Sequence, residues 1–148
     1  MEPHAYNVNI EWNSDRKGTM SSPELNNTME VATPPNFPKG MEGIWSPEHL
    51  FTAAVAGCLM TTFLSIAENS KLDFVSFKLE SKGILEQIDG KFLMTCVELY
   101  PVVVIQVEKD RARAERILQK SEAACLISNS VKAKVEMQAV IQVMAIAA

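Results

Sequence analysis

The sequence predicts an α+β protein, and two kinds of pattern carry this prediction. Hydrophobic and polar residues alternate in several stretches, which is typical of strands with one buried face. Two other stretches have the length and spacing of helices. The chain has 148 residues, 47% of them hydrophobic, and is therefore long enough for a core of its own. We expect one domain over residues 1–148.

Four segments are expected to form strands. The segment 92–106 is strand-like in composition, and its Pro101 is expected at a bend or an edge, because proline has no N–H for the ladder. The last segment, 131–143, alternates most clearly of all. The alternating apolar residues of the other two segments are Tyr6, Val8, Ile10 and Trp12 near the start, and Val75, Phe77 and Leu79 in the middle.

The first helix is predicted from Ser46 to about Ser70. Ser46 is a residue type that caps helix N-termini, Pro47 suits the first helical position, and Glu48 suits the positive end of the helix dipole. The loop before it, residues 32–40, contains three prolines and a glycine.

Residues 50–67 of this helix carry no charge, and 18 residues is the lower limit of a membrane span. We interpret the segment as a buried central helix and expect no membrane span, because small and hydroxyl residues interrupt it and His49 and Glu68 bound it closely. A helix that is apolar nearly all round must be covered on most sides. The chain is short for that task, which favours a dimer.

The second helix is predicted over residues 108–124. Its inner face carries apolar residues at helical spacing, and the opposite face is charged. These residues are Ala114, Ile117, Leu118, Ala124 and Cys125.

Charge and cysteine usage exclude several classes of function. The net charge is −4 and no basic stripe is present, which argues against nucleic acid and anionic membranes as partners. The three cysteines are widely spaced and only two histidines accompany them, so we expect neither a disulfide framework nor a metal site. The first residues lack the basic, apolar character of a secretory leader, and we expect a cytoplasmic protein.

Two of the three cysteines stand out by their placement. Cys58 lies in the middle of the first helix, directly after Gly57, and Cys125 ends the inner face of the second. Thiols on the inner faces of two helices can meet in the core, although a helical cysteine is more often inert packing. Cys96 lies in a strand with nothing obvious to activate it, and we interpret it as packing.

Five short motifs are spread over nearly the whole chain: Asp-Arg-Lys-Gly at 15–18, Val-Ala-Thr-Pro-Pro-Asn-Phe at 31–37, Trp-Ser-Pro-Glu-His-Leu-Phe at 45–51, Ala-Gly-Cys at 56–58, and Cys-Leu-Ile-Ser-Asn at 125–129. In this combination the chain resembles the OsmC/Ohr family of thiol-dependent hydroperoxide reductases. One difference is Leu126, since the better-studied members usually have proline after the second cysteine.

The resemblance implies an OsmC-like intertwined homodimer, with antiparallel sheets packed around two central apolar helices. It implies an organic hydroperoxide reductase with an antioxidant role in the oxidative stress response. Cys58 would be the peroxidatic thiol, Cys125 the resolving thiol, and Arg16 with Glu48 the activating pair. No bound cofactor is implied. An external dithiol, of the lipoyl type by resemblance, would reduce the Cys58–Cys125 disulfide.

An apolar mouth near the start of the first helix fits such a substrate. Its expected lining is Trp45, Phe37, Leu50 and Met41, and the same residues fit ordinary packing equally well. A second hypothesis is a non-catalytic dimeric module that binds an apolar ligand or acts as a redox switch. A thiol hydrolase is disfavoured, because no histidine is placed as a base, and we assign His49 no chemistry.

The spacing of Glu48 and Cys58 predicts a site built from two chains. Ten residues in one straight helix separate them by ~15 Å along the axis and leave them about 80° apart around it. Glu48 then cannot orient an arginine resting on Cys58 of its own helix. Either the helix breaks between the two residues, or Glu48 and Arg16 act on Cys58 of the partner.

Overall fold

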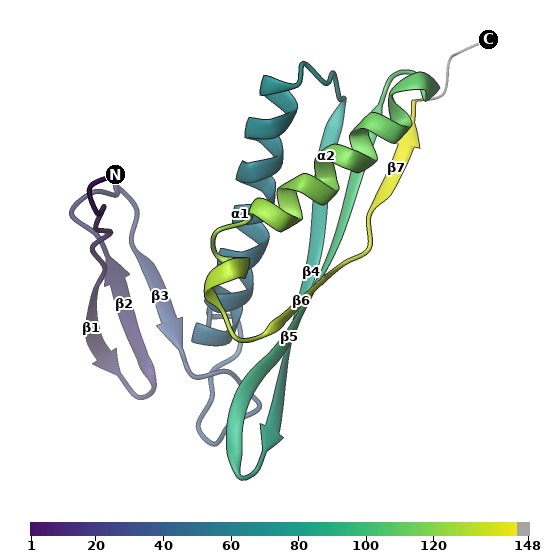
Figure 1. Cartoon of the computed structure of the whole chain (residues 1–148). Coiled ribbons are helices and arrows are strands. Elements are labelled where there is room, and N and C mark those ends of the chain that lie inside the picture. The colour runs from purple at the N-terminus through teal and green to yellow at the C-terminus, as the bar shows by residue number, and fades with distance from the viewer. Residues whose placement is uncertain (145–148) are drawn as a thin grey trace. The chain divides into compact units, whose positions relative to one another are not determined.

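The computed structural model describes residues 1–144 and confirms the α+β class (Figure 1). Internal contacts divide the chain into two compact units, Met1–Leu50 and Phe51–Ala148. The single domain expected over residues 1–148 therefore stays a prediction.

The first unit is built on a small antiparallel sheet. Its strands follow each other in the order β1 (Asn9–Ser14), β2 (Lys17–Ser21) and β3 (Met29–Ala32). The loop predicted over residues 32–40 is confirmed except for Ala32, which ends β3, and it continues to residue 44. Gly40 permits its tight path. A Cβ atom at Gly40 would lie 1.9 Å from the carbonyl oxygen of Pro34, so that no larger residue fits there.

The prediction of a half-buried first strand was wrong in one respect. The strand forms, but it begins at Asn9, and its alternating apolar side chains are exposed, with Trp12 73% accessible. The physical reason is that the sequence pattern marks a face able to be buried, whereas the first unit holds no second layer that covers it. The exposed side chains of this apolar face are Tyr6, Val8, Ile10 and Trp12.

The second unit combines one sheet with two helices. α1 (Pro47–Asn69) leads into the long hairpin of β4 (Ser76–Ile88) and β5 (Lys91–Ile105). A short 3₁₀ turn, η1 (Glu108–Asp110), precedes α2 (Arg111–Ala124), and a second one, η2 (Ser128–Ser130), follows it. The chain ends, within the described residues, in β6 (Lys134–Met137) and β7 (Val140–Val143).

Both predicted helices are confirmed. Ser46 caps α1, because its Oγ accepts a hydrogen bond from the His49 amide at 3.1 Å. The helix runs to Asn69, one residue short of the predicted end. The second helix occupies the predicted range except that its first three residues form the tighter turn η1.

The predicted last strand is two strands rather than one. β6 and β7 each pair with β5 in parallel, so the sheet of the second unit is mixed and not purely antiparallel. Pro101 explains the interruption. It lies inside the central strand β5, between Leu99, which pairs with β6, and Val102, which pairs with β7. The expectation of an edge strand was wrong, but the missing N–H does fall where the ladder changes partner.

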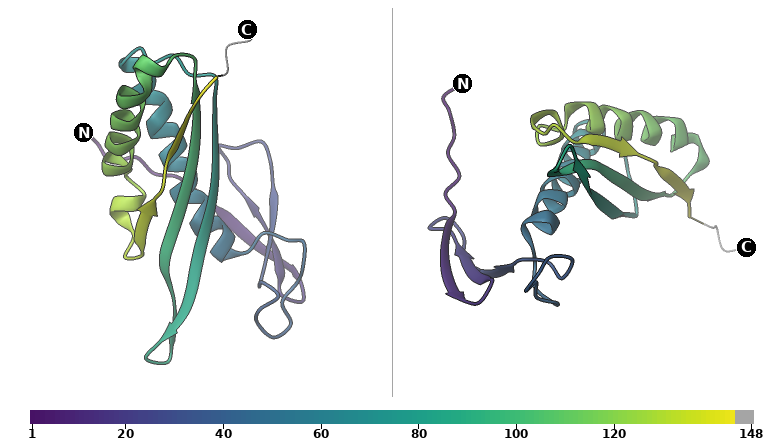
Figure 2. Two further views of the ribbon diagram at one scale, coloured as in Figure 1. Left: turned by 90° about the vertical axis from the view of Figure 1, so that its right-hand side faces the viewer. Right: turned by 90° about the horizontal axis from the view of Figure 1, so that it is seen from below.

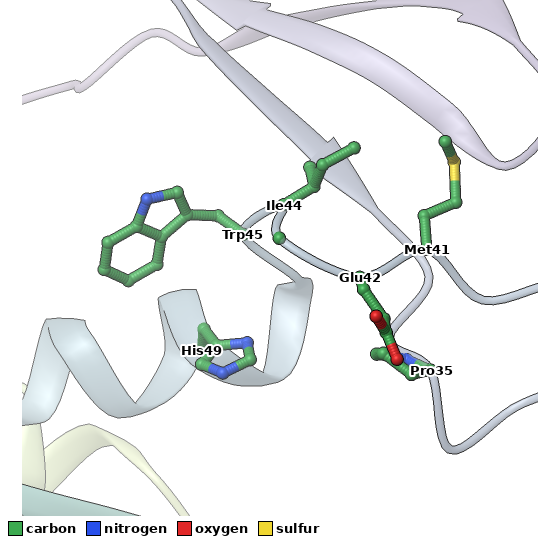
Figure 3. Close-up of a pocket in the computed structure, with 7 residues that line it drawn as sticks. Pro35, Met41, Glu42, Ile44, Trp45 and His49 are labelled. Atoms are coloured by element: carbon green, nitrogen blue, oxygen red, sulfur yellow. The ribbon is translucent and has the colours of Figure 1, made fainter.

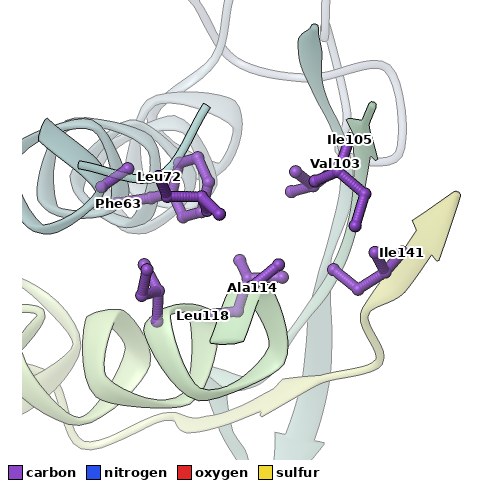
Figure 4. Packing of buried hydrophobic residues seen from close by; sticks show 9 residues of the cluster. Phe63, Leu72, Val103, Ile105, Ala114, Leu118 and Ile141 are labelled. Carbon is purple, nitrogen blue, oxygen red and sulfur yellow. The ribbon is translucent and has the colours of Figure 1, made fainter. Parts of the chain in front are cut away.

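The core of the second unit lies between its helices and one face of the sheet (Figures 2 and 4). Phe63 of α1 is fully buried and stacks on Phe77 of β4 at 4.9 Å between ring centroids. Around it pack residues from α1, α2, the strands and the loop between α1 and β4, namely Ala67, Leu72, Val103, Ile105, Ala114, Ile117, Leu118 and Ile141. A second cluster of four residues lies nearer the start of α1 and consists of Val55, Leu59, Val97 and Leu99.

Only one stripe of α1 is buried within the chain. The buried residues Val55, Leu59, Phe63 and Ala67 follow each other at intervals of four. By length and composition α1 could cross a membrane, and just 28% of its most apolar window is buried. Met60 and Leu64 are among the exposed residues of the helix, so the chain covers α1 incompletely.

Candidate functional site: a thiol pair

Cys58 and Cys125 meet within the second unit. α1 places Cys58 directly before Leu59 of its buried stripe, and Cys125 is the C-cap residue of α2. Their side chains lie close enough for each thiol to shift the pKa of the other. All three cysteines are free thiols, and Cys125 is almost fully buried, with 1% of its surface exposed. The Cys58 and Cys125 thiols, which the sequence places on the inner faces of two helices, are therefore neighbours in the folded chain.

A tight turn after α2 completes the surroundings of the pair. The carbonyl of Cys125 accepts a hydrogen bond from the Asn129 amide at 3.0 Å, and the carbonyl of Leu126 accepts one from Ser130 Oγ at 2.7 Å. Asn129 Nδ2 also donates to the carbonyl of Ala123 at 3.2 Å. These bonds hold the turn, whose Leu126 and Ile127 amides help to lower the pKa of the Cys58 thiol.

The pKa of the Cys58 thiol lies below its ordinary value. Burial is the largest single influence and raises the pKa, since it disfavours the charged thiolate. Four hydrogen bonds together outweigh it. They come from the Cys125 thiol, the Ile127 amide, the Thr62 hydroxyl (Oγ1 3.9 Å from Sγ) and the Leu126 amide.

The pKa of the Cys125 thiol is displaced in the opposite direction. Burial raises it first, and the neighbouring Cys58 raises it further. Ser128 opposes this shift, because its amide and hydroxyl lie beside the sulfur. The Ser128 hydroxyl is buried and makes no well-formed hydrogen bond within residues 1–144, so it acts as a nearby dipole rather than as a fixed donor. As the pH rises, Cys58 is therefore the thiol of the pair that loses its proton first.

Cys96 has the environment of a structural cysteine. It lies in β5, opposite Ile84 of β4 and Lys134 of β6. Burial raises the pKa of its thiol, and the carboxylates of Glu136 and Glu98 raise it further. A thiol with a raised pKa has less of the reactive thiolate form at a given pH, which supports the interpretation of Cys96 as packing.

Arg16 and Glu48 belong to the first unit. Arg16 lies exposed in the turn between β1 and β2, after Asp15, whose φ of 50° bends the chain. Its carbonyl accepts a hydrogen bond from the amide of Thr33 at 3.2 Å. Glu48 is the second residue of α1 and is partly buried. The activating role expected for these two residues stays a prediction.

The structure removes one of the two explanations for the spacing of Glu48 and Cys58. α1 runs without a break through both residues, so they are separated by about 15 Å along one helix axis. A break of the helix is thereby excluded. The other explanation, a contribution of Glu48 and Arg16 to Cys58 of a partner chain, stays a prediction.

A pocket of ≈ 440 Å³ lies before and at the start of α1 (Figure 3). Of the four predicted substrate residues, Trp45 and Met41 line it, whereas Phe37 and Leu50 do not. His49 also lines it, and its ring meets Trp45 edge-on at 6.0 Å between centroids. The remaining lining residues are Pro35, Glu42, Gly43 and Ile44.

Sequence reasoning missed several of these site residues. It gave no role to His49, although its position four residues after Trp45 at a helix start places the two rings side by side. The same spacing of four joins Cys58 to Thr62. The donation by main-chain amides at 126 and 127 left no signal in residue types. Among the described residues 1–144, no group of three His, Cys, Asp or Glu side chains is placed to hold a metal ion.

The model of the family described as OsmC-like protein matches residues 40–139, which is well over half of the chain. The chain belongs to the OsmC-like protein family. This family match and the arrangement of helices and sheets agree with the resemblance on which the site prediction rests.

Individual similar proteins cover almost the whole chain. The uncharacterized protein YmaD of Bacillus subtilis is 27% identical over an alignment 146 residues long that covers 93% of this chain and 93% of that protein. A structure of an OsmC-like protein of unknown function from Vibrio cholerae has a TM-score of 0.83 at 24% identity, over 93% of this chain and 100% of that one. A structure of an organic hydroperoxide resistance protein from Elizabethkingia anophelis has a TM-score of 0.75 at 19% identity, over 97% and 99%. At these identities the solved structures show a shared fold.

Proposed function

We propose that this protein reduces organic hydroperoxides, with Cys58 as the attacking thiol and Cys125 as the resolving thiol. The observation that carries the proposal is the contact between the two thiols and the opposite displacement of their pKa values. The attacking thiol reacts as the thiolate, whereas a resolving thiol can stay protonated until the sulfenic acid forms beside it. Organic hydroperoxide resistance proteins among the structural neighbours support the same direction.

The proposed reaction has three steps. The Cys58 thiolate attacks the terminal oxygen of ROOH, so that an S–O bond forms, the O–O bond breaks, and the departing RO⁻ takes up a proton to give the alcohol. The Cys125 sulfur then attacks the Cys58 sulfenic acid, which forms the disulfide and releases water. An external dithiol reduces the disulfide by exchange and is itself oxidised. A lipoyl-type dithiol is our proposal for this donor, and the reducing cytosol is the compartment in which such a cycle operates.

Ionisation of Cys58 supplies little of the rate on its own. Lowering a thiol pKa from ~8.5 to ~5.5 raises the thiolate fraction at pH 7 about thirtyfold. At a Brønsted slope of ~0.4–0.5 the same change costs roughly twentyfold in nucleophilicity. Orientation of the peroxide and stabilisation of the departing alkoxide must provide the rest. A guanidinium offers several donors in a fixed fork, which is the role we propose for Arg16, held by Glu48.

A homodimer would bring Arg16 and Glu48 to the thiols of the partner. Because α1 is unbroken, Glu48 of one chain cannot serve its own Cys58 through that helix. Two exposed apolar surfaces support a dimer, namely the face of β1 that includes Trp12 and the face of α1 that includes Met60. Gly57 lies on the exposed part of α1, where a Cβ atom would meet nothing within 4 Å in this chain. A second backbone has room to approach there.

The pocket lined by Trp45 and Met41 favours alkyl or lipid peroxides over hydrogen peroxide, because its lining is largely apolar. The alternative function is a non-catalytic dimer that binds an apolar ligand there and uses the thiols as a redox switch. The pocket alone fits both functions, whereas the opposite pKa displacements of the two thiols favour the peroxidase.

Turnover of cumene hydroperoxide in the presence of a dithiol tests the proposal. We expect catalytic turnover by the unsubstituted protein, loss of at least about 10³-fold on Cys58→Ser because the nucleophile is removed, and little change on the control Cys96→Ser. Consumption of a single equivalent of peroxide without turnover, whichever dithiol is offered, would instead identify a redox switch.

A further inference from the structure

We infer that His49 is a specificity-determining residue of the pocket at the start of α1. Its Nε2–H is a fixed hydrogen-bond donor, which selects neutral apolar molecules with an acceptor oxygen over hydrocarbons of the same shape. This inference deepens the proposed function, since a hydroperoxide is such a molecule, and it rests on that function for its catalytic meaning. The binding itself can be tested with molecules that cannot be reduced by a thiol.

A buried hydroxyl sets the position of the proton on the His49 ring. Ser46 is fully buried, and its Oγ accepts a hydrogen bond from the His49 main-chain amide at 3.1 Å. The same Oγ lies 2.7 Å from Nδ1 of His49. A buried hydroxyl hydrogen needs an acceptor, and Nδ1 is the acceptor that the structure places within reach. Nδ1 of the neutral ring therefore accepts, and the ring proton is on Nε2.

Main-chain hydrogen bonds hold the walls of the pocket around this donor. The carbonyl of Trp45 accepts a hydrogen bond from the amide of Ala32, and the amide of Met41 donates to the carbonyl of Thr33, both at 2.9 Å. The His49 ring meets Trp45 edge-on at 6.0 Å between centroids, and Figure 3 shows both rings at one side of the pocket. All of these residues belong to the first unit, so the pocket is formed by one compact part of the chain.

The side chains of the lining define the chemical class of the ligand. Met41, Ile44 and Trp45 offer apolar surface for an apolar body. Within residues 1–144 the exposed His49 ring makes no second hydrogen bond, so Nε2–H is available to a ligand. A site built to hydrogen-bond an oxygen discriminates against the analogue that lacks it. Glu42 also lines the pocket, and its carboxylate disfavours an anion there. The ligand is therefore neutral, apolar and able to accept one hydrogen bond.

His49 acts at a distance from the thiol of its own helix. Nine residues separate it from Cys58, which is about 13.5 Å along the unbroken α1. In the proposed dimer His49 would accompany its neighbour Glu48 to Cys58 of the partner subunit. There it would hold an organic hydroperoxide by its oxygen, beside the guanidinium of Arg16.

The experiment uses two probes of nearly the same shape, acetophenone and α-methylstyrene, in which a C=CH₂ group replaces the carbonyl. Binding to the full chain is followed by the ¹H–¹⁵N signal of the Trp45 indole, which is assigned with Trp12→Phe. The variant His49→Phe keeps a ring but lacks the N–H, whereas the control His49→Gln keeps a donor. In His49→Phe we expect the Kd of acetophenone to rise about fivefold, the loss of one neutral hydrogen bond, and that of α-methylstyrene to change less than about twofold. In His49→Gln we expect both values to stay near those of the parent.

Three outcomes of this titration would overturn the inference. Equal changes of both Kd values in His49→Phe, with unchanged circular dichroism, would mean that the ring only packs against the ligand or caps the helix. A Trp45 signal that responds to neither probe would mean that the pocket does not bind this class of molecule. Tighter binding of benzoate than of acetophenone would mean that the pocket prefers an anion.

A second measurement needs no substitution at His49. The chain has two histidines, so that His4→Gln assigns their ring signals. A long-range ¹H–¹⁵N spectrum should show the neutral His49 ring with its proton on Nε2, and acetophenone, but not α-methylstyrene, should shift the Nε2 signal. A proton on Nδ1, or equal shifts with both probes, would contradict the inference even if His49→Phe failed to fold. Neither readout depends on turnover, so a protein that failed the peroxidase assay could still confirm the donor.

Discussion

The thiol pair is surrounded by residues of its own chain, whereas one face of the sheet in the first unit is not covered. Cys58 and Cys125 are enclosed by α1, α2 and the turn between α2 and β6, and their donors all come from the second unit. The apolar face of β1, by contrast, is amphipathic in sequence but exposed in the structure. The second unit therefore supplies the surroundings of the thiol pair itself, whereas the apolar face of β1 has no cover within its own unit.

This difference indicates which part of the proposed site the second unit lacks. Cys58 and Cys125 lie in the second unit. Arg16, which we propose to orient the peroxide, lies in the first unit beside the exposed strand β1. A second copy of the chain would cover an apolar surface and bring the arginine to the thiols at the same time. Two equivalent sites per dimer follow from the two-fold symmetry of such an assembly.

Replacing one large aromatic residue in each region gives the largest contrast. Phe63→Ala leaves a cavity in the core and should lower the free energy of unfolding by about 3–5 kcal/mol. Trp12→Ala removes an exposed ring and should change the free energy of unfolding of the isolated chain by no more than about 0.5 kcal/mol. It should weaken self-association instead. Urea titration and sedimentation of both variants measure the two effects, and a Trp12→Ala protein with unchanged self-association would show that β1 faces solvent in the dimer.

Removal of the arginine should affect catalysis more than ionisation. We expect Arg16→Ala to lower peroxide reduction by about 10²-fold, because a donor to the departing alkoxide is lost. The loss should exceed the change in the Cys58 thiolate fraction measured by alkylation. Arg113→Ala serves as the control, since Arg113 donates to the carbonyl of Ser70 and lies in the second unit. Full recovery of Arg16→Ala at high pH would contradict a positioning role.

Subunit exchange decides which chain supplies the arginine. A Cys58→Ser chain is mixed with a chain that carries Arg16→Ala and Glu48→Ala, both inactive alone. In a shared site one of the two sites of the heterodimer is complete, so activity should return towards half of the parent value. A proven heterodimer without recovered activity would place each site within one chain.

The smallest expected effect is the order in which the three thiols ionise. The pKa of Cys58 is lowered, whereas the pKa values of Cys125 and Cys96 are raised. Alkylation should therefore begin at Cys58 as the pH rises towards the ordinary thiol range. Because the unfolded chain holds the Cys58 proton more tightly, stability should also rise with pH between the folded pKa of Cys58 and its ordinary value. Site-resolved alkylation between pH 5 and 9 measures the order, and equal midpoints would remove the basis for assigning Cys58 as the nucleophile.

Much of the fold could be predicted because it is encoded locally. The cap at Ser46, the helical spacing in α2 and the alternation near the end of the chain each indicate one element without knowledge of the others. The sequence did not reveal that the last segment pairs in parallel with β5, because alternation is the same for either direction. Nor did alternation in β1 reveal whether its cover comes from the same chain.

The candidate site was predictable in its sulfur atoms and not in its main chain. Residue types and helix faces indicated that Cys58 and Cys125 could meet. The amides of Leu126 and Ile127 carry no such signal, because every residue except proline has one. Predicting them requires the course of the turn, which depends on the hydrogen bonds of Asn129 and Ser130.

The central claim is that Cys58 and Cys125 form one redox pair, and a peptide map tests it most directly. The protein is treated with one equivalent of cumene hydroperoxide, digested without reduction, and analysed by mass spectrometry. We predict a disulfide between Cys58 and Cys125 of the same chain, with Cys96 free, because these two thiols already interact in the folded chain. A disulfide that includes Cys96, or a Cys58 that stops at sulfinic acid while Cys125 stays reduced, would contradict the account.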